Sequence, residues 1–109
     1  MPEEDPQEML MQLQQTQQQL QQITVQKEET ESEIQEAEKA LDEIEDQDEG
    51  KVYSSIGSIM VEKDRDELKE ELEDRVEDLE VRKKSLDRKE KQLQKKMQES
   101  RESFQQNMQ

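Results

Sequence analysis

The sequence contains no cysteine, no histidine and no tryptophan among its 109 residues. The lack of cysteine excludes a disulfide framework and a thiolate metal site. The lack of histidine removes the commonest general base and metal ligand, so a nucleophile has no such base to pair with. Two glycines are too few for a glycine-rich loop around a phosphate group. We therefore expect no enzymatic activity, no bound metal and no cofactor.

Apolar residues are also scarce, because hydrophobic residues make up 27% of the chain and charged residues 43%. Such a chain cannot bury enough apolar surface in a compact globule to offset its ordering entropy. A disordered chain and a long coiled coil are the two classes that remain. No apolar run approaches the roughly 20 residues that span a bilayer, and no signal-peptide pattern opens the chain. We expect a cytoplasmic protein with no membrane partner.

The net charge of -15 is concentrated in the first half of the chain. Residues 1–50 hold 16 acidic and 2 basic side chains, whereas residues 51–109 hold 15 acidic and 14 basic ones. Because the acidic half would repel phosphates, we expect no binding to nucleic acid. The run from Arg82 to Lys96 is an exception, with eight basic and two acidic residues. We interpret it as facing the acidic first half, and a basic docking patch is the alternative.

Two segments without glycine or proline carry residues at coiled-coil spacing. The first has one series at Leu13, Leu20, Lys27, Ile34 and Leu41, and another at Met9, Thr16, Ile23, Thr30, Ala37 and Ile44. The second has Leu72, Leu79, Leu86, Leu93 and Ser100, with companions Lys69, Val76, Lys83, Glu90, Met97 and Phe104. The glutamines of the first segment are also typical of a disordered polar tract, but the leucines keep their spacing through it. The spacing predicts helices over residues 7–48 and 65–107, after a frayed start at residues 1–6.

The two predicted helices share one antiparallel register. If Leu41 faces Leu72, the same register places Leu20 opposite Leu93 and Met9 opposite Phe104. The midpoint of this register falls inside the interruption between the segments, so the chain can fold back on itself. The sequence therefore predicts a mainly α fold, a long antiparallel two-helix coiled coil forming one domain over residues 1–109.

The interruption at residues 50–63 is rich in β-branched residues and has a turn signal at Gly57-Ser58. We predict a central β-hairpin there, and an irregular loop is the alternative. An isolated two-stranded hairpin is marginal in water and leaves two unpaired edges. We therefore expect hairpins of several chains to assemble into a shared sheet. The expected interface residues are Val52, Tyr53, Ile56, Ile59, Met60 and Val61.

These features resemble the prefoldin family, specifically its archaeal-type beta subunits. The resemblance rests on short stretches in the right order, and the central hairpin between two equal arms is its most specific part. One hairpin is typical of the beta type, since the alpha type carries two. The matching stretches are residues 23–27, 38–44, 52–53, 55–61, 66–68, 79–82 and 90–93.

The resemblance implies a hetero-hexamer in which this chain joins further copies of itself and an alpha-type subunit. Their hairpins would form an oligomeric β-barrel body from which the coiled coils project. It also implies an ATP-independent holdase that binds unfolded polypeptides and delivers them to a group II chaperonin. The alternative is a structural coiled-coil adaptor that binds one folded partner along a helix face.

Apolar residues near both termini are candidates for the client-binding surface. Leu10 and Met11 lie off the predicted seam, so a two-helix coil cannot cover them. Methionine is flexible and polarizable, which suits a surface that binds many partners. The alternative is that Met9 and Phe104 only close the end of the coil. The client-binding residues we expect are Met9, Leu10, Met11, Leu13, Met97, Phe104 and Met108.

Overall fold

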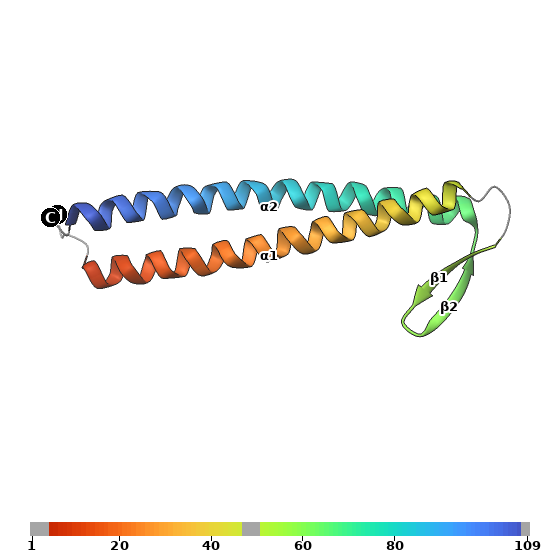
Figure 1. Ribbon diagram of the computed structural model, residues 1–109, viewed down its shortest axis with the longest axis horizontal. Coiled ribbons are helices and arrows are strands. Elements are labelled where there is room, and N and C mark those ends of the chain that lie inside the picture. The colour runs from red at the N-terminus through yellow and green to blue at the C-terminus, as the bar shows by residue number, and fades with distance from the viewer. Residues whose placement is uncertain (1–4, 47–50, 108–109) are drawn as a thin grey trace. The chain divides into compact units, whose positions relative to one another are not determined.

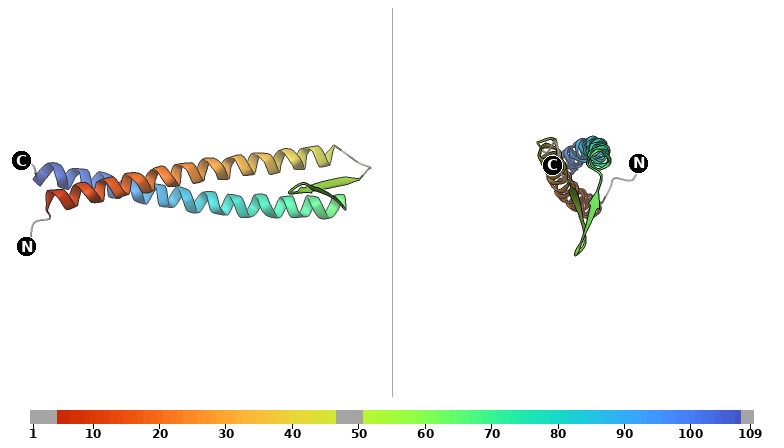
Figure 2. Two further views of the ribbon diagram at one scale, coloured as in Figure 1. Left: turned by 90° about the horizontal axis from the view of Figure 1, so that it is seen from below. Right: turned by 90° about the vertical axis from the view of Figure 1, so that its right-hand side faces the viewer.

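The computed structural model describes residues 5–46 and 51–107. Helix α1 runs over Pro6–Glu45, strand β1 over Val52–Ile56, strand β2 over Ile59–Lys63 and helix α2 over Arg65–Asn107. The chain divides into two compact units. We call residues 1–29 with 84–109 the terminal unit, and residues 30–83 the hairpin unit. Within each unit, α1 and α2 run side by side in opposite directions (Figures 1 and 2).

The start of α1 is set by Asp5. Its side-chain Oδ1 accepts a hydrogen bond from the backbone N–H of Gln7 at 3.1 Å, and its carbonyl accepts one from Met9 at 3.1 Å. Asp5 is thus an N-cap, and Pro6 occupies the first helical position, where its missing N–H costs nothing. The helix begins one residue earlier than predicted. It ends at Glu45, and the predicted end at residue 48 lies outside the described residues.

Helix α2 has the bounds that the sequence predicts. The carbonyl of Asp64 accepts the backbone N–H of Leu68 at 3.0 Å, which places Asp64 at the N-cap. Asp66 and Glu67 in the first turn stabilise the helix, because their negative charges lie near the positive end of the helix dipole. The last turn of α1 contains no basic residue, but Arg65 Nε donates a 3.0 Å hydrogen bond to the carbonyl of Ile44. A cation from the second helix therefore stabilises the end of the first.

The predicted seam is confirmed, because every one of its positions in both helices is buried or half-buried. In the hairpin unit, the buried seam residues are Leu79 of α2 and four residues of α1, namely Thr30, Ile34, Ala37 and Ile44. Glu31 and Lys83 approach to 3.5 Å, and Glu45 and Lys69 approach to 3.8 Å. These two pairs fit the antiparallel register predicted from the heptads.

In the terminal unit, the buried seam residues are Met9 and Thr16 of α1 and Leu86 of α2. The Thr16 hydroxyl donates a 2.9 Å hydrogen bond to the Gln12 carbonyl, so its burial leaves no polar group unpaired. The start of α1 and the end of α2 lie at the same end of this unit (Figure 1).

Lys27 interrupts the leucine series of α1 and is the one basic residue on its seam. Its Nζ lies 2.7 Å from Asp87 and 3.2 Å from Glu90, both on α2. Hydrogen bonds to Asp87 and Glu90 raise the pKa of Lys27 above its ordinary value. A lysine at a seam position can pair with these carboxylates in only one alignment of the two helices. The pair therefore helps to specify the register.

Candidate functional site

The hairpin is the first candidate site. Strands β1 and β2 pair antiparallel, with Val52 opposite Lys63 and Ile56 opposite Ile59. Gly57 has φ of 61°, and among the described residues no non-glycine residue has a positive φ. A positive φ at the first central position alone is the pattern of a type II′ turn, whose twist suits a two-residue hairpin loop. The predicted hairpin and its turn are therefore confirmed.

Both faces of the hairpin carry apolar side chains, because alternate residues along a strand point to opposite sides. One face, which we call the valine face, consists of Val52, Ser54, Ile56, Ile59, Val61 and Lys63. The other, the tyrosine face, consists of Tyr53, Ser55, Met60 and Glu62. A sheet with apolar residues on both faces needs two covering layers, and the described part of this chain covers neither face fully.

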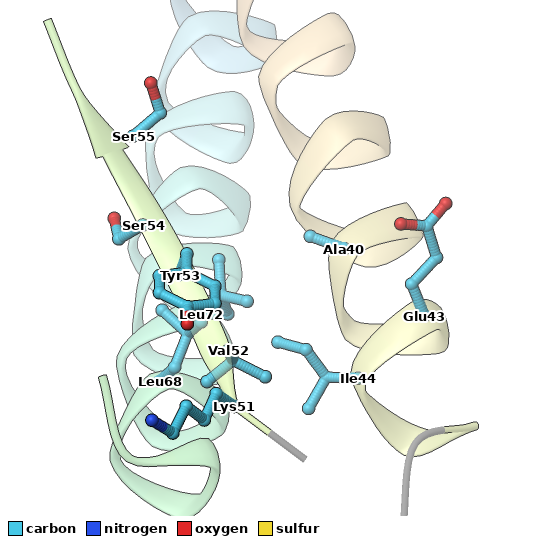
Figure 3. A pocket seen from close by; sticks show the side chains of 10 residues that line it. All are labelled: Ala40, Glu43, Ile44, Lys51, Val52, Tyr53, Ser54, Ser55, Leu68 and Leu72. Atoms are coloured by element: carbon cyan, nitrogen blue, oxygen red, sulfur yellow. The ribbon is translucent and has the colours of Figure 1, made fainter. Parts of the chain in front are cut away.

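The predicted interface residues differ in exposure. Ile56, Ile59 and Met60 are 59%, 64% and 65% exposed. Tyr53 and Val61 are also exposed, whereas Val52 is buried in the hairpin unit. Figure 3 places Val52 beside Ile44. Five of the six predicted residues are thus accessible to another chain, and Val52 packs within its own.

A cavity of about 470 Å³ lies between β1 and the two helices of the hairpin unit. Figure 3 shows the side chains that line it. Aliphatic residues of both helices contribute, namely Ala40, Ile44, Leu68 and Leu72. In the described part of the chain, β1 and β2 pair only with each other. Each strand therefore has a free edge that can accept hydrogen bonds from another strand.

The end of the terminal unit is the second candidate site. Leu10 is 43% exposed and Met11 60% exposed, as their positions off the seam predict. Met9 is buried, while Leu13, Met97 and Phe104 are half-buried. Met108 lies outside the described residues. Leu10 and Met11 are therefore the accessible apolar members of the predicted client-binding set within the described chain.

The basic run of α2 faces an acidic residue of α1 only near its start, so our interpretation holds for a small part of the run. Lys83 pairs with Glu31, but within the described residues the other basic members form no ion pair. The reason is that α1 has no charged residue from Met9 to Gln26.

The acidic charge is concentrated in the hairpin unit. Since residues 30–83 hold 21 acidic and 8 basic side chains, 13 of the 15 excess negative charges belong to the hairpin unit.

The described residues offer little for metal chemistry or membrane insertion. Across residues 5–46 and 51–107, no group of three or more acidic side chains is placed to hold a metal ion. Over the same ranges, neither helix contains a stretch long and apolar enough to cross a bilayer.

Comparisons with known proteins converge on one family. The prefoldin subunit family (Prefoldin_2) matches residues 7–109. The crystal structure of the prefoldin beta subunit from Thermococcus strain KS-1 superimposes with a TM-score of 0.82 and 42% sequence identity, covering 94% of this chain and 90% of that one. A prefoldin subunit beta from Methanopyrus kandleri is 59% identical over 34 residues, a stretch that spans 31% of this chain and 27% of that protein.

Proposed function

The chain belongs to the prefoldin subunit family, and from this membership we propose that it serves as a subunit of an ATP-independent holdase. The family consists of chaperone subunits that form hetero-oligomeric complexes and is not enzymatic. In our proposal, the hairpin assembles the complex and the end of the terminal unit binds non-native polypeptides. The bound polypeptides then pass to a group II chaperonin in the cytoplasm.

The exposed apolar hairpin is the observation that carries this proposal. Four of its side chains are more than half exposed, namely Tyr53, Ile56, Ile59 and Met60. Burying an apolar side chain of this size fully stabilises by about 1.5–3 kcal/mol, so covering the remaining surface of these four gains roughly 4–7 kcal/mol per hairpin. A gain of that size favours pairing with hairpins of further copies and of an alpha-type subunit, in a shared β-barrel body.

Client binding at the terminal unit is supported by the exposure of Leu10 and Met11. Such contacts are hydrophobic and carry no sequence pattern, so they suit many non-native chains. Two exposed side chains provide a weak site. Several subunits that bind one polypeptide together would strengthen it through effective concentration.

Two double variants test the two parts of the proposal separately. Ile56→Asp with Ile59→Asp places charges on the valine face and should dismantle the oligomer, which native mass spectrometry measures. Leu10→Gln with Met11→Gln should preserve the oligomer but lose the ability to suppress aggregation of a denatured client protein, followed by light scattering. An oligomer mass unaffected by the aspartates would refute the role of the hairpin. Full aggregation suppression by the glutamine variant would refute the role of Leu10 and Met11.

A further inference from the structure

One side of the terminal unit has a groove between α1 and α2, with a volume of about 360 Å³. Ile23 and Leu93, both half-buried seam residues, supply its apolar surface. The other lining residues are Gln19, Gln22, Lys89, Gln92 and Lys96. We call this the lysine groove. The groove thus has an aliphatic floor, and amide groups and two exposed ammonium groups line its sides.

The charges of the two lysines are not neutralised by ion pairs within the described part of the chain. Residues that flank the seam of a coiled coil commonly carry opposite charges, which pair between the helices. Here the α1 side of the groove supplies only Gln19, Gln22 and Ile23. Among the described residues, neither Lys89 nor Lys96 forms an ion pair. Their charge is therefore available to a bound molecule.

The lysine groove also continues toward the candidate client-binding end. A smaller groove of about 190 Å³ shares Lys96 and extends to Met9, Gln12 and Ser103. Glu99 also lines this smaller groove, so its charge is mixed. The larger groove has no carboxylate among its lining residues. The two grooves thus meet at Lys96, and the smaller one reaches Met9, a member of the predicted client-binding set.

We propose that the lysine groove binds acidic segments of non-native polypeptides. An aliphatic side chain of the segment contacts Ile23 and Leu93, while its carboxylates pair with Lys89 and Lys96. This inference rests on the proposed holdase function and adds a class of client segment to it. Charge complementarity makes the groove selective, because a basic segment with the same aliphatic residues is repelled.

A second copy of this chain is a poorer occupant than a non-native polypeptide. Its acidic segments use aliphatic residues such as Ile34 and Leu79 in their own core. A folded copy of those segments keeps these side chains from the base of the groove. Two chains that each carry a net charge of -15 also repel each other at low salt. A non-native polypeptide, by contrast, exposes aliphatic and acidic side chains together.

Fluorescence anisotropy with a labelled peptide of leucines and glutamates tests the inference on the full-length assembled protein. A matched peptide with glutamine in place of glutamate measures the contribution of charge. The test variant is Lys89→Gln with Lys96→Gln. The control variant, Lys84→Gln with Lys91→Gln, removes the same charge from exposed positions of α2 that do not line the groove. All measurements are made at low salt, where exposed charges are least screened.

We expect the test variant to bind the glutamate peptide roughly fivefold more weakly, as when two exposed charge contacts are lost. The control variant should bind like the wild type, and the glutamine peptide should bind both variants and the wild type equally. Equal weakening in both variants would overturn the inference, since it would indicate general attraction to the basic run. A change in oligomer mass confined to the test variant would also overturn it, because a second copy would then occupy the groove.

The proposed function can fail independently of this inference. The wild-type protein is also assayed for suppression of aggregation of a denatured client that lacks acidic segments. Suppression by the wild type, together with equal binding of the glutamate peptide by the two lysine variants, refutes the groove and leaves the holdase proposal standing. An absence of suppression refutes the holdase proposal itself.

Discussion

Replacing Ile59 with serine is predicted to weaken assembly without unfolding the coil. Ile59 is 64% exposed and lies beside Ile56 across the turn, so this chain gains little from its side chain. Full burial of isoleucine stabilises by about 1.5–3 kcal/mol. Because about one-third of Ile59 is already covered, assembly should lose roughly 1–2 kcal/mol per copy, or about 5–30-fold in association per contact.

Val81 provides a matched control for this substitution. It is also β-branched and is 62% exposed, but it lies on α2 away from the hairpin. Sedimentation velocity over a range of concentrations should show dissociation of Ile59→Ser at concentrations where the wild type and Val81→Ser stay assembled. Circular dichroism should show the same helix content in all three. Equal behaviour of the two serine variants in sedimentation would refute the assignment of the hairpin as the interface.

Three further outcomes follow from the turn, the seam lysine and the acidic charge. Gly57→Ala should weaken assembly by about 1 kcal/mol per copy, because alanine is strained at the φ of 61° that the turn requires. No atom lies within 4 Å of the added methyl group, so we expect no further steric cost. Ser58→Ala, measured the same way, should have no effect. The stability that Lys27 contributes is fully present below the ordinary lysine pKa of about 10.4 and is lost as pH rises through its raised pKa. The difference in Tm between wild type and Lys27→Gln should therefore shrink in strongly alkaline solution, and a difference independent of pH would contradict the ion pairs with Asp87 and Glu90. Assembly should strengthen with added salt, measured by native mass across a salt series, because it brings hairpin units of like charge together.

The heptad spacing was sufficient to predict the fold, since burial at the seam depends on the helical period and little else. It identified even polar members such as Thr16 and Thr30 as seam residues, and both are fully buried. The bounds of α1 were predicted less accurately. Asp5 caps the helix through a side-chain contact, and Asp5-Pro6 followed by Glu8 is a signal for a helix start. We had instead interpreted the two prolines of residues 1–6 as marking a frayed start.

The candidate sites could be predicted only in part. Residues off the seam, such as Leu10 and Met11, are exposed because a two-helix coil has no third element to cover them. Val52 was expected to contact other chains, but it is buried within its own unit. Its burial depends on how the hairpin packs against the helices, and alternation along a strand does not specify which helices lie beneath it.

The surroundings of the basic run show why the charge of a half-chain misleads. The first 50 residues are strongly acidic, yet the register that pairs Leu20 with Leu93 sets the basic run against the glutamine tract. The charge that matters is that of the α1 segment opposite the basic run, and the predicted register was sufficient to identify that segment. The alternative interpretation, a basic docking patch, included Lys89 and Lys96 of the lysine groove but not its aliphatic floor.

The division of charge between the two units suits two different tasks. The hairpin unit carries 13 of the 15 excess negative charges, and the terminal unit carries two. High negative charge beside an exposed apolar hairpin opposes nonspecific association, so only a partner that covers the hairpin well offsets the repulsion. The terminal unit needs the opposite property, since a strongly acidic surface would repel acidic clients before any apolar contact formed. An uncharged glutamine face on α1 and unpaired lysines on α2 remove that barrier. Added salt should therefore act in opposite directions at the two sites. It should strengthen assembly at the hairpin and weaken the binding of acidic segments to the lysine groove.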